Sequence, residues 1–186
     1  MTTPPPHPNV FTIPLPDWLE RLNRQPRHFA DLPEAMAFVV AAAEINGVEG
    51  GGPFAAAVLG EGLDLVALGV NRVVPAGASL LHAEVVALLL AQQRLDSHDL
   101  STAGHFTLVT SCAPCAMCLG AIPYAGVRRV VCGARGSDAE AIGFDEGDKP
   151  DHWADKLRAR DIAVDEDIGR EQAVAVLNGY RGEIYT

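Results

Sequence analysis

The sequence predicts one three-layer α/β/α sandwich whose central sheet is mixed and has five strands. Its 186 residues are enough for one substantial core and too few for two ordinary domains. Segments typical of strands alternate with segments typical of helices, which favours a sheet covered by helices on both faces. The turn-rich EGLD joins the first two strands and favours an antiparallel hairpin, whereas helices separate the later strands, which are expected to run parallel.

The beginning of the chain is rich in proline, with six prolines among the first 16 residues. Proline lacks a backbone N–H and disfavours helix at the residue before it, so we expect residues 1–30 to form an arm. A short helix is expected within this arm at residues 16–25, with Asp17 as its candidate cap. Residues 31–186 are expected to form the folded domain.

From residue 31 onward the helix and strand patterns are regular. The first helix is predicted at residues 31–47, where Asp31 is the candidate cap and Gly47 ends the apolar pattern. The two strands of the hairpin are predicted at residues 52–60 and 63–74.

The remaining elements alternate between strand and helix as far as residue 180. Strands are predicted at residues 105–111, 127–133 and 161–165, and helices at residues 82–95, 114–126, 151–160 and 169–180. Pro114 is expected in the first turn of its helix, where a missing N–H costs no hydrogen bond.

Charge and hydropathy limit the partners and the location of the chain. The formal net charge is −10, and no run of basic residues is longer than the pair Arg128 and Arg129, which argues against a nucleic-acid partner. The longest apolar run, Val85 to Ala91, is far shorter than the roughly 20 residues of a membrane span. The N-terminus lacks the features of a secretory signal, so we expect a cytoplasmic protein with no membrane partner.

Two cysteines form a C-x-x-C pair between a predicted strand and a predicted helix. Cys115 and Cys118 are three residues apart, which puts them on one face of the first helical turn. The positive end of the helix dipole there favours thiolates over thiols. The pair is therefore a candidate for metal binding or for redox chemistry.

The segment HAE at residues 82–84 favours a metal site. His82 supplies an imidazole and Glu84 follows two residues later, and H-x-E followed by P-C-x-x-C is a known signature of zinc deaminases. His82, Cys115 and Cys118 are the predicted ligands of one Zn²⁺ per subunit, with water or hydroxide as the fourth ligand. Zinc lowers the pKa of that water towards neutrality, and Glu84 is placed to accept its proton and return it to a leaving amine.

Two other interpretations of the cysteines remain open at this point. A thioredoxin-like redox pair would leave His82 and Glu84 without a purpose. A closed structural zinc site would need a fourth ligand such as Cys112, and a protein built on it would be a binding module without catalysis. We expect Cys112 to point away from the pair at the end of its strand, and expect Cys112 and Cys132 to be buried packing residues.

Several segments of the sequence carry a resemblance to a known family. They are GGPFAAAV (51–58), NRVVP (71–75), HAE (82–84), LVTSCAPCAMCLGAI (108–122) and EAIGFDEG (140–147). Together they resemble bacterial guanine deaminases of the cytidine-deaminase-like superfamily, over roughly residues 35–186. The resemblance implies a cytidine-deaminase-like fold, a homodimer, and hydrolysis of guanine at C2 to xanthine and ammonia in purine metabolism.

The resemblance also implies roles for residues outside the zinc signature. Phe54 would stack on the purine base, Asn71 would hydrogen-bond its edge, and Glu146 would face the amino group as a substrate-binding and catalytic residue. His82 would border the substrate as well as the metal. The C-terminal tail with Tyr185 is similar to tails that close the pocket, in some cases from the neighbouring subunit.

The chemistry of guanine supports a carboxylate at position 146. Guanine presents two adjacent donors, the ring N1–H and the exocyclic amine, and an ionised Glu146 is an acceptor-only group. Adenine would place a ring acceptor against the same carboxylate and leave polar groups unpaired. A purine small molecule is therefore the expected partner. Guanosine or an aminotriazine such as ammeline shares this donor edge and remains an alternative, and a tRNA adenosine deaminase is a more distant one because the charge is unfavourable.

Overall fold

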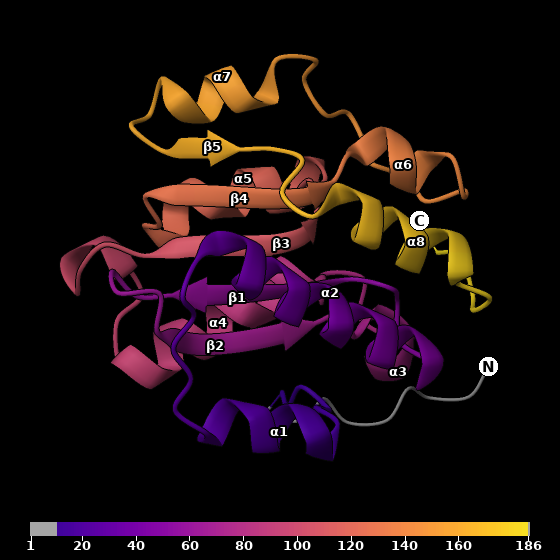
Figure 1. Ribbon diagram of the computed structural model, residues 1–186, viewed down its shortest axis with the longest axis horizontal. Helices are drawn as coiled ribbons and strands as arrows, with labels where there is room; N and C mark the ends of the chain where they lie inside the picture. The colour runs from indigo at the N-terminus through magenta and orange to yellow at the C-terminus, as the bar shows by residue number, and fades with distance from the viewer. Residues whose placement is uncertain (1–10, 186) are drawn as a thin grey trace, which may run out of the picture.

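The computed structural model describes residues 11–185 as a sheet of five strands between two layers of helices (Figure 1). The strands are β1 (Ala55–Leu59), β2 (Leu65–Val70), β3 (Thr107–Cys112), β4 (Arg129–Ala134) and β5 (Ala163–Asp165). Their order across the sheet is β2-β1-β3-β4-β5. β1 pairs antiparallel with β2 and β3, whereas β3, β4 and β5 are parallel, which confirms the predicted mixed sheet.

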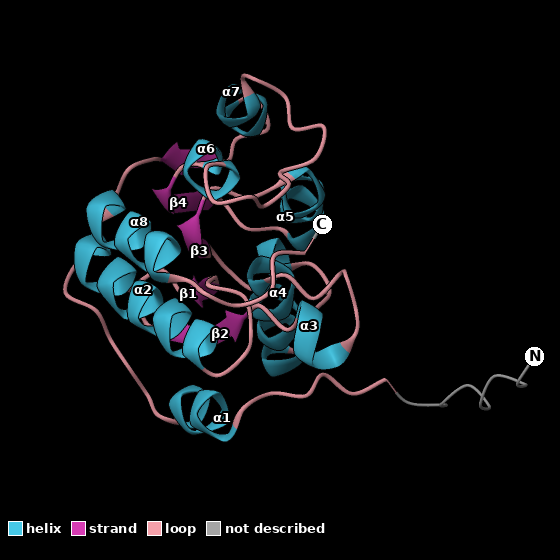
Figure 2. Cartoon of the chain, turned by 90° about the vertical axis from the view of Figure 1, so that its right-hand side faces the viewer, coloured by secondary structure: helices cyan, strands magenta, loops and turns pink. Residues whose placement is uncertain are grey.

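Helices cover both faces of the sheet, as Figure 2 shows. One face is covered by α2 (Leu32–Val48) and α8 (Arg170–Gly179), and the other by α4 (Ala83–Leu95) and α5 (Ala116–Ala125). The shorter helices are α1 (Asp17–Arg24), α3 (Val73–Ala76), α6 (Gly136–Glu140), α7 (Trp153–Arg158) and the 3₁₀ turn η1 (Leu100–Thr102).

Alternation along the strands divides the interior into two apolar cores. In β3 the neighbours Leu108 and Val109 are both fully buried, but they belong to different cores. Val109 packs with residues of α2 and α8, and Leu108 with residues of α4 and α5. Successive strand residues point to opposite faces, so both layers of helices are needed to bury the sheet.

The strand directions bring three separate segments to one edge of the sheet. Because β1 is antiparallel to both neighbours, its first residue lies beside the last residues of β2 and β3. Ala55 pairs with Val70, and Ala56 pairs with Thr110. Residue 54 before β1, residue 71 after β2 and residues 113–115 after β3 therefore meet at this edge.

Three residues predicted to mark helix ends lie at other positions in the structure. Asp17 lies in the first turn of α1 and makes no capping hydrogen bond. Gly47 lies inside α2, which continues to Val48. Pro114 precedes α5, in which Cys115 takes the N-cap position, and the N–H of Ala116 is bound by the carbonyl of Glu146 at 2.9 Å. Glu146 is distant from Pro114 in the sequence, so the residues around Pro114 could not predict this hydrogen bond.

The segment around α1 packs along the edge strand β2. Leu19 is fully buried, and the Asn23 side chain pairs with the backbone of Leu68, donating to its carbonyl at 2.9 Å and accepting from its N–H at 2.6 Å. A side chain paired in this way binds the backbone N–H and carbonyl groups that an edge strand would otherwise leave exposed. The prolines before residue 11 lie outside the described residues, and the predicted division of the chain at residue 30 stays a prediction. Within residues 11–185, no helix is both long enough and apolar enough to cross a membrane.

Candidate active site

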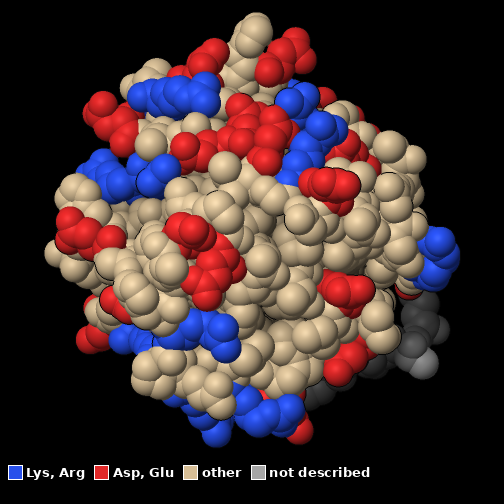
Figure 3. Space-filling view, viewed as in Figure 1, with Lys and Arg blue, Asp and Glu red and all other residues tan. Residues whose placement is uncertain are grey.

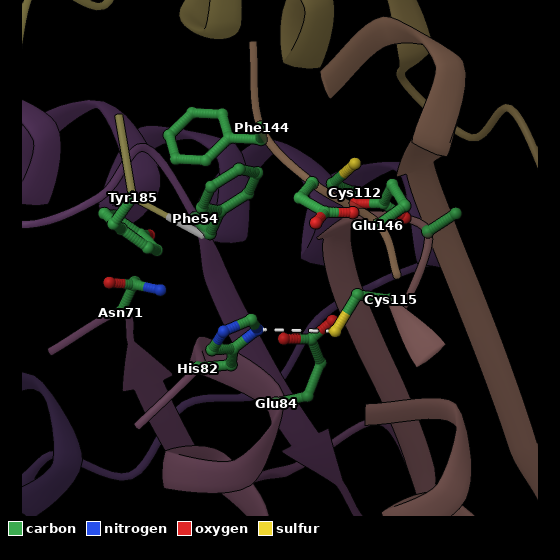
Figure 4. Close-up of a pocket in the computed structure, with 11 residues that line it drawn as sticks. Phe54, Asn71, His82, Glu84, Cys112, Cys115, Phe144, Glu146 and Tyr185 are labelled. Carbon is green, nitrogen blue, oxygen red and sulfur yellow. Dashed lines mark hydrogen bonds between the residues drawn. The ribbon is translucent and has the colours of Figure 1, made fainter. Parts of the chain in front are cut away.

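The predicted metal ligands lie together at the starts of two helices. His82 is the N-cap of α4, Cys115 is the N-cap of α5, and Cys118 lies in the first turn of α5. One ligand atom from each residue lies within 4.8 Å of the other two. His82 Nδ1 is 3.5 Å from Cys115 Sγ (Figure 4). Elements far apart in the sequence thus bring one imidazole and two sulfurs to a single point.

This donor set fits zinc in both chemistry and spacing. A tetrahedral zinc ion with bonds of about 2.1 Å to nitrogen and about 2.3 Å to sulfur separates its ligand atoms by roughly 3.5–3.8 Å. The 3.5 Å between His82 Nδ1 and Cys115 Sγ matches this spacing. Three protein ligands leave one coordination position open, which is the arrangement of catalytic rather than structural zinc sites.

The pKa values of the two thiols are shifted in opposite directions. A hydrogen bond from Cys118 lowers the pKa of the Cys115 thiol to about 4, although burial opposes the change. The pKa of Cys118 is raised by the same hydrogen bond, by burial and by the charge of Glu84. For His82, burial lowers the pKa, but the bond to Cys115 and the charge of Glu84 outweigh it and the net direction is upward. A bound cation would let both sulfurs ionise together.

Glu84 is the second residue of α4 and points towards the same centre (Figure 4). Its exposed fraction is 7%, and burial together with the neighbouring Cys115 raises the pKa of its carboxyl to about 7. A carboxyl that titrates near neutrality both accepts and releases protons at physiological pH.

A pocket opens directly beside these residues. Its lining comes from the loops at the sheet edge, the starts of α4 and α5, and the C-terminal tail: Phe54, Asn71, His82, Glu84, Cys112, Ala113, Cys115, Phe144, Asp145, Glu146 and Tyr185. Phe54 and Phe144 meet edge to face with ring centroids 4.8 Å apart (Figure 4). The structure thus brings every predicted site residue into this pocket, except Cys118, which lies behind it as a buried ligand.

Asn71 presents a fixed amide to the pocket. Its side-chain Oδ1 accepts a hydrogen bond from the N–H of Val73 at 3.2 Å, which sets the orientation of the amide. Among residues 11–185 its Nδ2 has no hydrogen-bond partner. Asn71 therefore offers the pocket hydrogen-bond donors.

Asn46 of α2 holds the loops that carry Phe54 and Asn71. Its Nδ2 donates to the carbonyls of Gly52 at 2.8 Å and Asn71 at 2.9 Å, and its Oδ1 accepts from Arg72 at 3.3 Å. The Asn46 side chain is fully buried. It gave no signal in the sequence, because an asparagine inside an apolar helix gains its role only from the loops that pack against it.

We expect Asn46→Ala to lower the free energy of unfolding by about 2–4 kcal/mol, because two buried carbonyls lose their donor. Urea denaturation followed by circular dichroism measures the change. Asn178→Ala, at an exposed position of α8, is the control and is expected to change stability by less than about 0.5 kcal/mol. Equal stabilities of the two variants would contradict a supporting role for Asn46.

Glu146 lies on the opposite wall of the pocket from Asn71 (Figure 4). Its exposed fraction is 7%, and its Oε2 accepts a hydrogen bond from Lys149 Nζ at 3.0 Å. Burial raises the pKa of the Glu146 carboxyl, and the charge of Lys149 partly offsets the rise. The sequence motif EAIGFDEG indicated Glu146 but gave no role to Phe144 or Lys149.

Tyr185 lines the pocket from the C-terminal tail. Its ring packs edge to face on Phe144, with centroids 5.1 Å apart. Its buried hydroxyl has no hydrogen-bond partner among the described residues. A Cβ at position 52 would overlap this hydroxyl, so Gly52 leaves the space that Tyr185 occupies.

The two cysteines outside the metal group are buried. Cys112 packs in the core next to α2 and α8, and its Sγ donates to the carbonyl of Arg135 at 3.5 Å. Cys132 packs in the other core. Cys112 borders the pocket, yet it is not part of the cluster of His82, Cys115 and Cys118. The closed site with Cys112 as fourth ligand is therefore not formed.

A family model matches more than half of the chain. Residues 31–134 match the family model described as the cytidine and deoxycytidylate deaminase zinc-binding region. Guanine deaminase of Bacillus subtilis strain 168 is 40% identical over 96 residues, which make up 52% of this chain and 59% of that protein. The chain thus matches less than two thirds of the length of this curated relative.

Solved structures extend the similarity over nearly the whole chain. A structure of guanine deaminase from Nitrosomonas europaea is 45% identical, with a TM-score of 0.91 and coverage of 95% of this chain and 98% of that one. A crystal structure of a variant protein bound to 8-azaguanine is 46% identical, with a TM-score of 0.90 and coverage of 92% and 97%. A tRNA:A34 deaminase structure is 21% identical with a TM-score of 0.60 and shares the fold alone.

Proposed function

Because the chain belongs to the zinc-binding cytidine and deoxycytidylate deaminase family, whose members are zinc-dependent hydrolytic deaminases, we propose that it converts guanine and water to xanthine and ammonia. One observation carries the proposal. A single pocket is bordered by His82 and Cys115 of the zinc ligand set and by a buried carboxylate beside them, and it holds an acceptor-only carboxylate opposite an amide donor.

In this proposal His82, Cys115 and Cys118 hold zinc, and Glu84 moves protons. Zinc supplies Lewis acidity, which makes water a nucleophile at neutral pH. Glu84 would accept a proton from the attacking water and deliver it to the exocyclic nitrogen, which would leave as ammonia. Its buried position beside the ligands and its pKa of about 7 suit both transfers.

The remaining pocket residues fit the shape and polarity of guanine. Phe54 supplies an aromatic face, and the amide donors of Asn71 suit the acceptor atoms of the purine. Glu146 accepts hydrogen bonds from N1–H and the C2 amine, and so places the reacting carbon next to Glu84. Relatives described as guanine deaminases, and a solved structure bound to 8-azaguanine, support this assignment.

The proposal includes a cytoplasmic homodimer that acts on a free purine. The tail with Tyr185 closes the pocket of its own subunit or of its partner. On the face seen in Figure 3, basic side chains lie in separate small groups among acidic ones, which suits a small substrate better than a nucleic acid.

The test is steady-state kinetics on guanine with the zinc-loaded protein. We expect loss of guanine absorbance with release of one ammonia per guanine, and a kcat/KM for guanine at least about tenfold above the values for guanosine and ammeline. The same assay with cytidine and with an adenosine-containing tRNA stem-loop is expected to give no turnover. Turnover of cytidine or tRNA without turnover of guanine would end this proposal.

A further inference from the structure

A buried lysine lies behind the substrate-facing carboxylate. The sequence contains lysine only at positions 149 and 156, and the net charge is −10. Lys156 is exposed on α7, whereas the Lys149 side chain is only 11% exposed. Lysine is rarely buried without a partner, because removing its charge from water is costly. The burial of Lys149 therefore requires an explanation.

Lys149 and Glu146 form an ion pair that the fold encloses tightly. Lys149 Nζ lies 3.0 Å from Glu146 Oε2 and 5.0 Å from the centre of the Trp153 ring. A Cβ at position 136 would lie 2.8 Å from Glu146 Oε2 and 3.0 Å from Lys149 Nζ. Gly136, which begins α6, thus lets the backbone close over the pair.

The two oxygens of Glu146 have different surroundings. Oε2 is paired with Lys149, whereas Oε1 has no hydrogen-bond partner among the described residues. The backbone of the same loop is fixed as well, because the carbonyl of Glu146 accepts from the N–H of Ala116 at 2.9 Å and the N–H of Gly147 donates to Asp145 Oδ1 at 2.7 Å. Oε2 is therefore occupied by Lys149, and Oε1 is free to accept a hydrogen bond from a ligand.

Lys149 differs from the other groups near Glu146 in its effect on the carboxylate. Burial, Cys115 and Glu140 all raise the pKa of the Glu146 carboxyl, and Lys149 is the basic neighbour that opposes them. A neutral carboxyl would present a hydroxyl donor towards the two donors of the guanine edge, and the match would be lost.

We propose that Lys149 is a positioning residue that acts through Glu146. By pairing Oε2 it holds the carboxylate in place, with Oε1 directed at the pocket, and so makes the site selective for an edge with two adjacent donors. The inference rests on the proposed function, because that function places such an edge against Glu146.

A double-mutant cycle on guanine tests the inference. The wild-type protein, Lys149→Met, Glu146→Gln and the double variant are compared by kcat and KM, with zinc content and Tm measured for each. We expect Lys149→Met to raise KM at least about tenfold and to lower kcat/KM about a hundredfold, with zinc content unchanged. In the Glu146→Gln background, the same substitution is expected to change kcat/KM by less than about threefold, because the group through which Lys149 acts is already neutral.

Two variants keep the test decisive. Lys156→Met is the matched control and is expected to match the wild type. Lys149→Gln retains an N–H donor without the charge and is expected to lose less activity than Lys149→Met. If Lys149→Met fails to fold, Lys149→Gln takes its place in the cycle. An unchanged KM, or an equal loss with and without Glu146→Gln, would overturn the role of Lys149. Absence of guanine turnover by the wild type would instead contradict the proposed function.

Discussion

Glu84→Gln is expected to lower kcat for guanine at least about a thousandfold while the protein still binds one zinc per chain. Glutamine has nearly the same shape as glutamate, but its amide does not take up and release a proton near neutral pH. The side chain lies beside His82 and Cys115 with an exposed fraction of 7%, so bulk water does not readily replace it. Steady-state kinetics, metal analysis and thermal unfolding of the same preparation separate loss of catalysis from loss of structure.

Glu44→Gln is the matched control for this change. Glu44 is exposed on α2, and its replacement is expected to leave kcat, zinc content and Tm unchanged. Wild-type turnover by Glu84→Gln with zinc bound would show that this carboxylate does not move the protons. The proposed role of this site in catalysis would then be wrong.

Cys118→Ala is expected to reduce zinc content below about one tenth per chain and to abolish measurable turnover. Cys118 is fully buried, and its sulfur is one of three ligand atoms that lie within 4.8 Å of one another. With this sulfur removed, only two protein ligands remain, too few for a stable catalytic zinc site. Tm is also expected to fall, because a metal that binds only the folded state stabilises that state.

Cys132→Ala tests whether removal of any buried cysteine has the same effect. Cys132 is 1% exposed and packs in the core near α4 and α5, outside the metal group. Its replacement is expected to keep one zinc per chain and most of the activity, with a moderate loss of stability from the small cavity. Equal zinc contents in the two variants, after dialysis against a weak chelator, would contradict the assignment of Cys118 as a ligand.

The sequence was most informative where the relevant geometry is local. The i, i+3 spacing of Cys115 and Cys118 at a helix start puts both sulfurs on one face, and the two-residue spacing of His82 and Glu84 puts both at the start of α4. The alternation of strands and helices predicted the mixed sheet, and the sheet order confirms it.

Features that depend on distant segments were not predicted. The N–H at the start of α5 is bound by Glu146, so the local pattern placed Pro114 inside the helix when it lies outside. Asn46 and Lys149 lie in none of the motifs, and Phe144 lies in EAIGFDEG without a predicted role; the contacts of Asn46 and Phe144 come from loops elsewhere in the chain.

Sequence patterns alone therefore predicted the fold class, through the periodicity of helices and strands, and the metal ligands with the neighbouring carboxylate, through the H-x-E and P-C-x-x-C motifs. Three features of the pocket follow only from the tertiary structure: the orientation of the Asn71 amide, the ion pair of Glu146 and Lys149, and the position of Tyr185. These depend on contacts between residues far apart in the chain. Such contacts form when packing excludes water from polar groups and forces each of them to find a partner.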